Sequence, residues 1–141
     1  MLSPKVRSVS TCAGVLLALG LSACANPIVK TCAMGQQQYV SEMLYFGTDK
    51  PDGEVSSEDW QAFVEDVVTP RFPQGLTVWP AYGQWRMASG EIIQEGIYVL
   101  HVMHLGEPDR DSAIQEIIEA YKNNFQQEAV LRVQDEVCVS F

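Results

Sequence analysis

Apolar and polar positions alternate along the chain in segments that first suit a strand and then a helix. Residues 39–46 (YVSEMLYF) are rich in aromatic and β-favouring types, which predicts a first strand. Residues 49–53 (DKPDG) then predict a turn. Ser56 or Ser57 is placed to cap a helix that ends at Pro70. Its apolar residues recur at i, i+3, i+4 and i+7 spacing: Trp60, Phe63, Val64 and Val67.

Two further strands follow this helix. Residues 76–86 (LTVWPAYGQWR) form the first of them, and Pro80 within it favours a position at the edge of a sheet, where a missing N–H breaks no ladder. Ser89 and Gly90 form the turn into a long strand over residues 91–105.

A second helix follows Pro108, with Ser112 as its expected cap and Gln115 three residues later. Residues 129–133 and the tail 137–141 supply the last strand. The apolar stripe of this helix consists of Ile114, Ile117, Ile118, Tyr121 and Phe125.

The resulting order is β-α-β-β-α-β, which predicts an α+β fold of the ferredoxin-like kind: one antiparallel sheet with two helices on one face. In that topology the first and last strands are antiparallel neighbours. Cys32 precedes the first strand and Cys138 lies in the last, so the pair is placed to form a disulfide in an oxidising compartment. The alternative is that both remain free, buried thiols.

The strand over residues 91–105 is apolar on both of its faces, although two helices cover only one side of such a sheet. A second subunit, an apolar ligand or a partner protein would cover the other side, and a homodimer through this open face is our leading expectation. Ile93, Ile97, Val99 and Met103 point one way, and Tyr98, Leu100 and Val102 point the other.

The N-terminus has the layout of a bacterial export signal. Lys5 and Arg7 form a positive region, and the apolar stretch 13–21 that follows is too short to span a bilayer. Residues 21–24 (LSAC) resemble a lipobox, in which the sulfur of Cys24 accepts a diacylglyceryl group and becomes the new N-terminus. The alternative is ordinary secretion, with residues 23–25 (ACA) as the cleavage site.

Lipidation would divide the chain into a signal peptide (1–23), a lipidated N-terminus with a tether (24–38) and one domain (39–141). The residue after Cys24 is Ala25 and not an aspartate. In a bacterium with two membranes, this favours the periplasmic side of the outer membrane. We therefore expect the membrane lipid itself to be a partner, held through acylated Cys24.

Charge narrows the range of other partners. Lys5 and Arg7 leave with the signal, so the nine basic residues fall to seven against 18 acidic ones, and the net charge falls from −9 to −11. A surface this acidic repels phosphate backbones and anionic lipid headgroups, which argues against nucleic acid as a partner.

No recognised catalytic, cofactor or metal motif is present in the sequence. It contains neither G-x-S-x-G nor a phosphate-binding loop, and a disulfide would leave no thiol for catalysis. His101 and His104 form an H-x-x-H pattern, but residues three apart on a strand point to opposite faces and cannot share an ion. We expect no metal and no cofactor.

The polar residues best placed for binding a ligand lie close to aromatic residues. Arginine can clamp a carboxylate with two hydrogen bonds, and Tyr45, Tyr82 or Trp85 could stack on an apolar group. The alternative is internal pairing, for example of Arg86 with Glu95 across the hairpin turn. The candidates are Tyr45, Arg71, Gln84, Arg86, Glu95 and Arg132.

Several segments together resemble a bacterial family known only as domain of unknown function 3574. The resemblance covers about residues 43–141 and implies a small exported protein, often with a lipoprotein-type signal. It implies no activity, substrate or catalytic residue. Its motifs are Leu44-Tyr45-Phe46-Gly47, Thr69-Pro70-Arg71-Phe72-Pro73, Gly75-Leu76-Thr77-Val78, Gly83-Gln84-Trp85-Arg86, Tyr121-Lys122, Phe125-Gln126-Gln127, Val130-Leu131-Arg132-Val133 and Cys138-Val139-Ser140-Phe141.

Two functions fit these observations. The first is a non-enzymatic binding or interaction module held at the membrane. The second is a small-molecule enzyme on a dimeric ferredoxin-like barrel, with His101, Tyr45 or Arg86 as the reacting group, which rests on analogy between folds.

Overall fold

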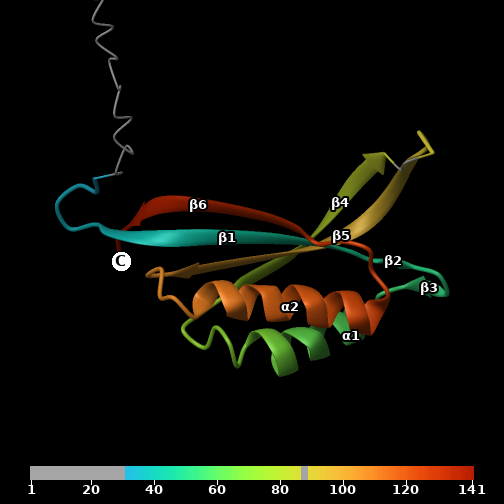
Figure 1. The fold of residues 1–141 in the computed structure, drawn as a ribbon, viewed down its shortest axis with the longest axis horizontal. Helices are drawn as coiled ribbons and strands as arrows, with labels where there is room; N and C mark the ends of the chain where they lie inside the picture. Colours follow the sequence, from blue (N-terminus) through green and yellow to red (C-terminus); the bar gives the residue numbers. More distant parts are fainter. Residues whose placement is uncertain (1–30, 87–88) are drawn as a thin grey trace, which may run out of the picture.

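One four-stranded antiparallel sheet carries two helical segments on one of its faces (Figure 1). The computed structural model describes residues 31–86 and 89–141, so Cys24 and the expected signal peptide lie outside the described residues. The strand order is β4-β5-β1-β6, with antiparallel neighbours throughout. The strands are β1 (Gln37–Gly47), β4 (Thr77–Arg86), β5 (Ile92–His104) and β6 (Leu131–Val139).

Two helical segments pack beneath the sheet. The first runs as α1 (Ser57–Phe63) and continues as a π-helical turn, η1 (Val64–Val68). The second is α2 (Arg110–Phe125). A small hairpin, β2 (Asp49–Lys50) and β3 (Gly53–Glu54), occupies the segment expected to be a turn.

The sequence predicts most of this arrangement. The strand that contains Pro80 lies at the sheet edge, and the first and last long strands are neighbours, as expected. Ser56 is the N-cap of α1, because its hydroxyl oxygen accepts a hydrogen bond from the backbone N–H of Asp59 at 3.1 Å.

Two expectations about local structure are wrong. The second helix begins at Arg110 with Asp109 as its N-cap, and Ser112 lies inside it, where its hydroxyl donates back to the carbonyl of Asp109 at 2.8 Å. The last strand is continuous and not split around its polar residues, because it pairs with β1 along its whole length, from Val139 opposite Gln37 to Leu131 opposite Tyr45.

The hydrophobic core lies between the sheet and the helices and is dominated by aromatic rings. The ring of Phe46 lies 4.6 Å from that of Tyr121 and 5.1 Å from that of Trp60, between ring centroids. The hydroxyl of Tyr121 donates to the carbonyl of Gly47 at 2.9 Å, which ties α2 to the end of β1. Among the residues that the structure describes, no helix is long and apolar enough to cross a bilayer.

The expected disulfide is present. Cys32 and Cys138 are bonded, with their Cα atoms 5.5 Å apart, and they are separated by 106 positions in the sequence. Cys138 lies opposite Gln38 in the register of β1 and β6, so the bond closes the outer end of that strand pair.

Removing this bond is expected to destabilise the domain strongly, because it closes a loop of more than a hundred residues in the unfolded chain. In the chain-entropy model a loop of this length is worth about 4–5 kcal/mol. The free energy of unfolding in urea, measured for the wild type and for the double variant Cys32→Ser/Cys138→Ser, tests this. Equal stabilities, or alkylation of both thiols without reductant, would contradict it.

Candidate functional site

The sheet face opposite the helices is largely apolar. It carries the odd-numbered residues of β5, and Val99 is buried there even though the helices lie on the other side. This bears out the prediction that β5 is apolar on both faces. The exposed large hydrophobic residues of this face are Trp79, Trp85, Met103, Leu131 and Val133.

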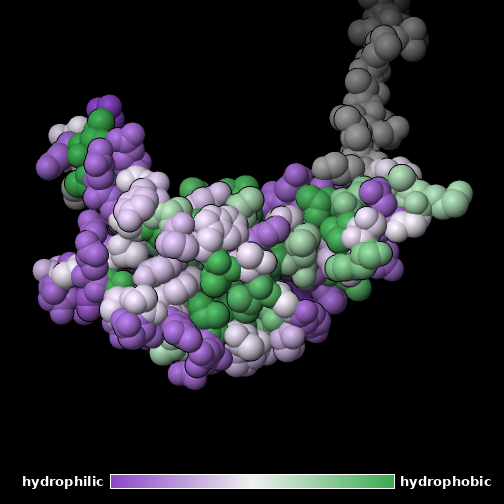
Figure 2. Space-filling view, turned by 180° about the vertical axis from the view of Figure 1, so that it is seen from behind, coloured by the Kyte–Doolittle hydropathy of each residue, from purple (hydrophilic) through white to green (hydrophobic). Residues whose placement is uncertain are grey.

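The end of the β4–β5 hairpin bends away from the helices and stands apart from the rest of the sheet (Figure 1). The space-filling view shows a hollow between this hairpin end and the body of the molecule (Figure 2). A pocket of about 670 Å³ lies at this end of the open face. Its walls come from the ends of β1 and β4, the start of β5, the β2 turn and the loop between α2 and β6.

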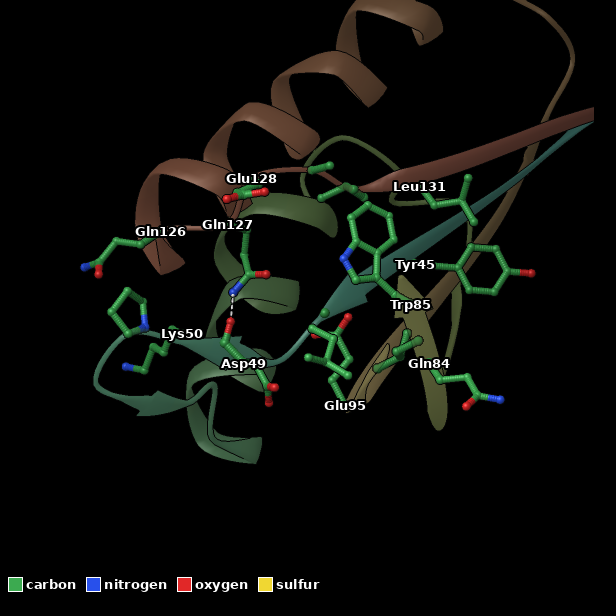
Figure 3. Close-up of a pocket in the computed structure, with 16 residues that line it drawn as sticks. Tyr45, Asp49, Lys50, Gln84, Trp85, Glu95, Gln126, Gln127, Glu128 and Leu131 are labelled. Carbon is green, nitrogen blue, oxygen red and sulfur yellow. Dashed lines mark hydrogen bonds between the residues drawn. The ribbon is translucent and has the colours of Figure 1, made fainter. Parts of the chain in front are cut away.

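One side of the pocket is apolar and the other is polar (Figure 3). Tyr45 and Trp85 lie together on the apolar side, and Asp49 and Lys50 lie across from them with Gln126 (Figure 3). The apolar side is completed by Ile93, Ile97 and Leu131, and the remaining polar residues are Gln84, Glu95, Gln127 and Glu128.

Two glycines make room for the side chains of the pocket floor. A Cβ atom at Gly47 would lie 2.6 Å from an Oε atom of Glu95, so the Glu95 carboxylate rests directly over the backbone of Gly47. A Cβ atom at Gly83 would collide with the end of the Ile97 side chain. The absence of side chains at these positions lets Glu95 and Ile97 lie flat against the sheet.

The surroundings of the Glu95 carboxyl group disfavour its charged form. Partial burial raises its pKa above the ordinary value of 4.5, and the nearby charge of Asp49 raises it further. The backbone N–H of Asp49 donates a hydrogen bond that offsets part of this increase in pKa. Within the described ranges, no lysine or arginine forms an ion pair with Glu95.

The loop after α2 is fixed to the β2 hairpin at the polar side of the pocket. The side-chain amide of Gln127 donates to the carbonyl of Asp49 at 2.6 Å (Figure 3). Gln126 ends α2 with a left-handed backbone (φ 56°), which turns the chain toward the pocket. The polar wall is therefore held in place from two distant parts of the sequence.

The structure brings together three of the six residues that the sequence singled out for binding. Tyr45, Gln84 and Glu95 line the pocket. The suggested pairing of Arg86 with Glu95 is wrong, because Arg86 lies opposite Ile92 and Glu95 lies opposite Gly83. Arg86 and Glu95 therefore point to opposite faces of the sheet.

Arg132 lies on the helix side of the sheet, away from the pocket. Its guanidinium donates to both oxygens of Glu42, at 2.6 and 2.8 Å, and to Asp111 at 2.7 Å. Glu42 is fully buried and also accepts from Gln134 at 2.8 Å. Because these hydrogen bonds favour the charged form, the pKa of Arg132 is raised. Its role here is to neutralise a buried carboxylate.

Arg71 is likewise engaged on the helix layer. It donates to Glu116 at 3.1 Å and to the carbonyl of Val67 at 2.7 Å, so it joins the end of the first helical segment to α2. Of the arginines proposed from the sequence, Arg71 and Arg132 are both held by such internal contacts.

The two histidines lie on opposite faces of β5, as their spacing predicts. His101 shares a hydrogen bond of 2.8 Å with Ser41 on the open face. His104 lies on the helix side, with its Nε2 atom 3.8 Å from the buried Glu42. In the part of the chain that the structure describes, no cluster of three or more His, Cys, Asp or Glu residues could hold a metal ion.

Several residues that line the pocket were not among the binding candidates that the sequence singled out. Gly47 and the loop residues 126–130 are missed because their contribution depends on where the chain folds back, and no local pattern records that. Lys50 was assigned only to a turn. For Glu95, which the sequence did single out, the signal is a charge within a strand segment rich in apolar residues, which is costly unless the position has a use.

The Glu95 carboxyl is expected to make the stability of the domain depend on pH. Because its pKa is raised in the folded state, the folded state loses stability as pH rises from about 4.5 through that higher pKa. Glu95→Gln removes this penalty, so the variant should match the wild type in acid and exceed it near neutral pH. Urea unfolding of both proteins across this range measures the difference.

The matched control is Glu54→Gln, which removes an exposed carboxylate of β3 close to the pocket but outside its lining. A stability difference between wild type and Glu95→Gln that stays constant with pH would contradict the prediction.

Comparison with known proteins identifies both a family and a fold. The family model described as protein of unknown function (DUF3574) matches residues 41–141. None of the curated proteins matches the chain in sequence. Among solved structures, a phage SAM lyase in complex with S-methyl-5'-thioadenosine is similar, with a TM-score of 0.55 and 15% identity over 82% of this chain and 97% of that one.

The same phage enzyme in its apo state gives a TM-score of 0.54 and 16% identity, over 80% of this chain and 96% of that one. At such low identity the similarity concerns the fold alone.

Proposed function

We propose that this chain, which belongs to the DUF3574 family of unknown function, is a lipid-anchored envelope protein that binds a small organic molecule in the pocket on its open sheet face. The observation that carries the proposal is the pocket itself: about 670 Å³ in volume, apolar and aromatic on one side, with the carboxylate of Glu95 resting on its floor. We propose binding without catalysis as its main role.

The pocket has the size and composition of a small-molecule site. Such sites enclose roughly 300–1,000 Å³ and combine mostly apolar walls with a few placed polar groups. Here the rings of Tyr45 and Trp85 supply apolar area, and the carboxyl of Glu95 supplies a polar contact. Trp85 is 54% exposed and Leu131 is 61% exposed, so a ligand would bury apolar surface that now faces solvent.

We also propose that the topology is ferredoxin-like. The strand order β4-β5-β1-β6, with antiparallel neighbours and both helical segments on one face, supports this assignment. The structural neighbour holds S-methyl-5'-thioadenosine, which is consistent with small organic ligands on a fold of this shape. That support is an analogy between folds, and the pocket residues carry the argument.

Binding in the pocket predicts a specific effect of two tryptophan substitutions. Indole and p-cresol, titrated into isotope-labelled protein, should shift the NMR signals of Gly47, Ile97 and Glu128. Trp85→Ala should weaken this binding about tenfold, the effect of losing roughly 1.4 kcal/mol of ring contact. Trp79→Ala is the control, because Trp79 lies on the same strand and is partly exposed but does not line the pocket.

Signals that shift around Met103 and Val133 would place the binding elsewhere on the open face. That result, or an equal effect of the two tryptophan variants, would contradict the proposed site.

The anchor gives a second prediction, at a residue outside the described part of the chain. We propose that Cys24 is lipidated and holds the domain on the periplasmic side of the outer membrane. The wild type should fractionate with membranes and carry the mass of a diacylglyceryl group, and Cys24→Ser should release it from them. A wild-type protein cleaved without added lipid would show ordinary secretion.

A second candidate function is an enzyme acting on a small molecule in the same pocket. The observation that favours it is the raised pKa of Glu95, since perturbed carboxyl groups in cavities often serve as general acids or bases. Turnover of a small organic compound that is abolished by Glu95→Gln, and kept by Glu54→Gln, would establish this function. Binding of a compound that is recovered unchanged favours the binding module.

We further propose that a second copy of the chain covers the rest of the open face. Met103 and Val133 are 41% and 44% exposed there, on strands either side of β1. Sedimentation velocity should give a dimer for the wild type and a monomer for Val133→Lys. Gln115→Lys, which adds the same charge on the helix layer, should remain a dimer. A monomeric wild type would rule the dimer out.

A further inference from the structure

The lining of the pocket combines negatively charged groups with apolar and aromatic side chains. Three carboxylates, of Asp49, Glu95 and Glu128, line it together with one ammonium group, that of Lys50. Lys50 already pairs with Asp52, whose carboxylate lies 3.7 Å away. The lining charge is therefore negative, and the net charge of −9 on the whole chain adds to the potential there.

We propose that the ligand of this pocket is a small organic ammonium ion, with Glu95 as its counter-ion and the rings of Tyr45 and Trp85 as its walls. This inference rests on the proposed function, because it names the class of molecule that the same pocket binds.

The carboxylate of Glu95 is the first reason for a cationic ligand. It lies over the backbone of Gly47, at the floor of the pocket, and no lysine or arginine of the described chain pairs with it. A charge in this position is costly without a partner of opposite charge, and a ligand cation would supply one. Glu42, the fully buried carboxylate of the same domain, already has two hydrogen bonds from Arg132. Among the described residues, Glu95 has no arginine or lysine partner of this kind, and the backbone N–H of Asp49 donates to it instead.

The aromatic wall is the second reason, and it selects an organic ion over a metal ion. The ring faces of tyrosine and tryptophan attract weakly hydrated cations such as methylated ammonium groups. A metal ion needs several oxygen, nitrogen or sulfur ligands at short distance, and among the described residues no cluster of three or more acidic, histidine or cysteine side chains offers them. The ring carbons of Tyr45 and Trp85 supply no such ligands.

The remaining walls suit an ion with an apolar body. Ile93, Ile97 and Leu131 present only hydrocarbon to the pocket. A ligand that placed its charged head against Glu95 and its body against these residues would satisfy both sides at once. A compact, strongly hydrated inorganic ion would leave them uncovered.

The charge of Glu95 also predicts how binding responds to pH. A bound cation favours the ionised carboxyl, so binding should weaken as pH falls through the pKa of Glu95, which burial raises above its ordinary value. The other titratable groups that face the pocket are those of Tyr45, Asp49, Lys50 and Glu128. Glu95→Gln should remove the part of the pH response that belongs to Glu95.

A pair of probes with the same shape tests the role of charge directly. Choline carries a trimethylammonium group, and 3,3-dimethylbutan-1-ol has the same shape with carbon in place of the charged nitrogen. Binding is measured by NMR titration with the exported chain carrying Cys24→Ser, which retains the whole described domain. Choline should bind at least about tenfold more tightly than the alcohol, a difference of roughly 1.4 kcal/mol.

The variants then assign the effect to residues. Glu95→Gln should lower the affinity for choline about tenfold and leave that for the alcohol unchanged, whereas Glu54→Gln should alter neither. Trp85→Leu should weaken choline binding more than Trp79→Leu does, because leucine keeps apolar bulk but removes the ring face. Benzyltrimethylammonium should bind more tightly than choline, because its ring adds apolar contact.

Three results would overturn this inference: equal affinities for choline and the alcohol, no loss with Glu95→Gln, or no cation binding at all. If indole and p-cresol still bind in the pocket in those cases, the small-molecule site stands and only the ligand class is wrong. If none of the probes binds there, the proposed function fails as well.

Discussion

The packing of aromatic side chains against one face of the sheet is the interaction on which the rest of this structure depends. Phe46 of β1 lies in contact with rings from α1 and α2, and the hydroxyl of Tyr121 holds the carbonyl of the adjacent Gly47. Because of this packing, the helices cover one face of the sheet. Because β5 is apolar on both sides, it also leaves apolar surface exposed on the other face.

The same packing determines where the pocket forms. Once Tyr121 holds the end of β1, the backbone of Gly47 becomes a rigid floor, and the Glu95 side chain lies across it. The loop that leaves α2 then reaches the β2 hairpin through Gln127 and closes the polar side. The core and the pocket thus lie on opposite sides of the same end of β1. The packing of the core therefore positions the site.

The candidate site could be predicted only in part. Tyr45, Gln84 and Glu95 stood out as polar or aromatic residues near apolar strands, and all three line the pocket. Arg71 and Arg132 stood out for the same reason but serve internal ion pairs with Glu116 and Glu42. A guanidinium suits a buried carboxylate and a ligand carboxylate equally well, so residue type alone does not separate these roles.

The sequence by itself determined the order of the long strands and the two helices and the edge position of the strand with Pro80, and it marked Cys32 and Cys138 as the candidate disulfide pair. These follow from periodicities of two and 3.6 residues and from the adjacency of the first and last strands. Only the tertiary structure decided which charges are neutralised and where the sheet face is hollowed. Both depend on contacts between residues far apart in the chain, such as Gln127 with Asp49, which no local pattern encodes.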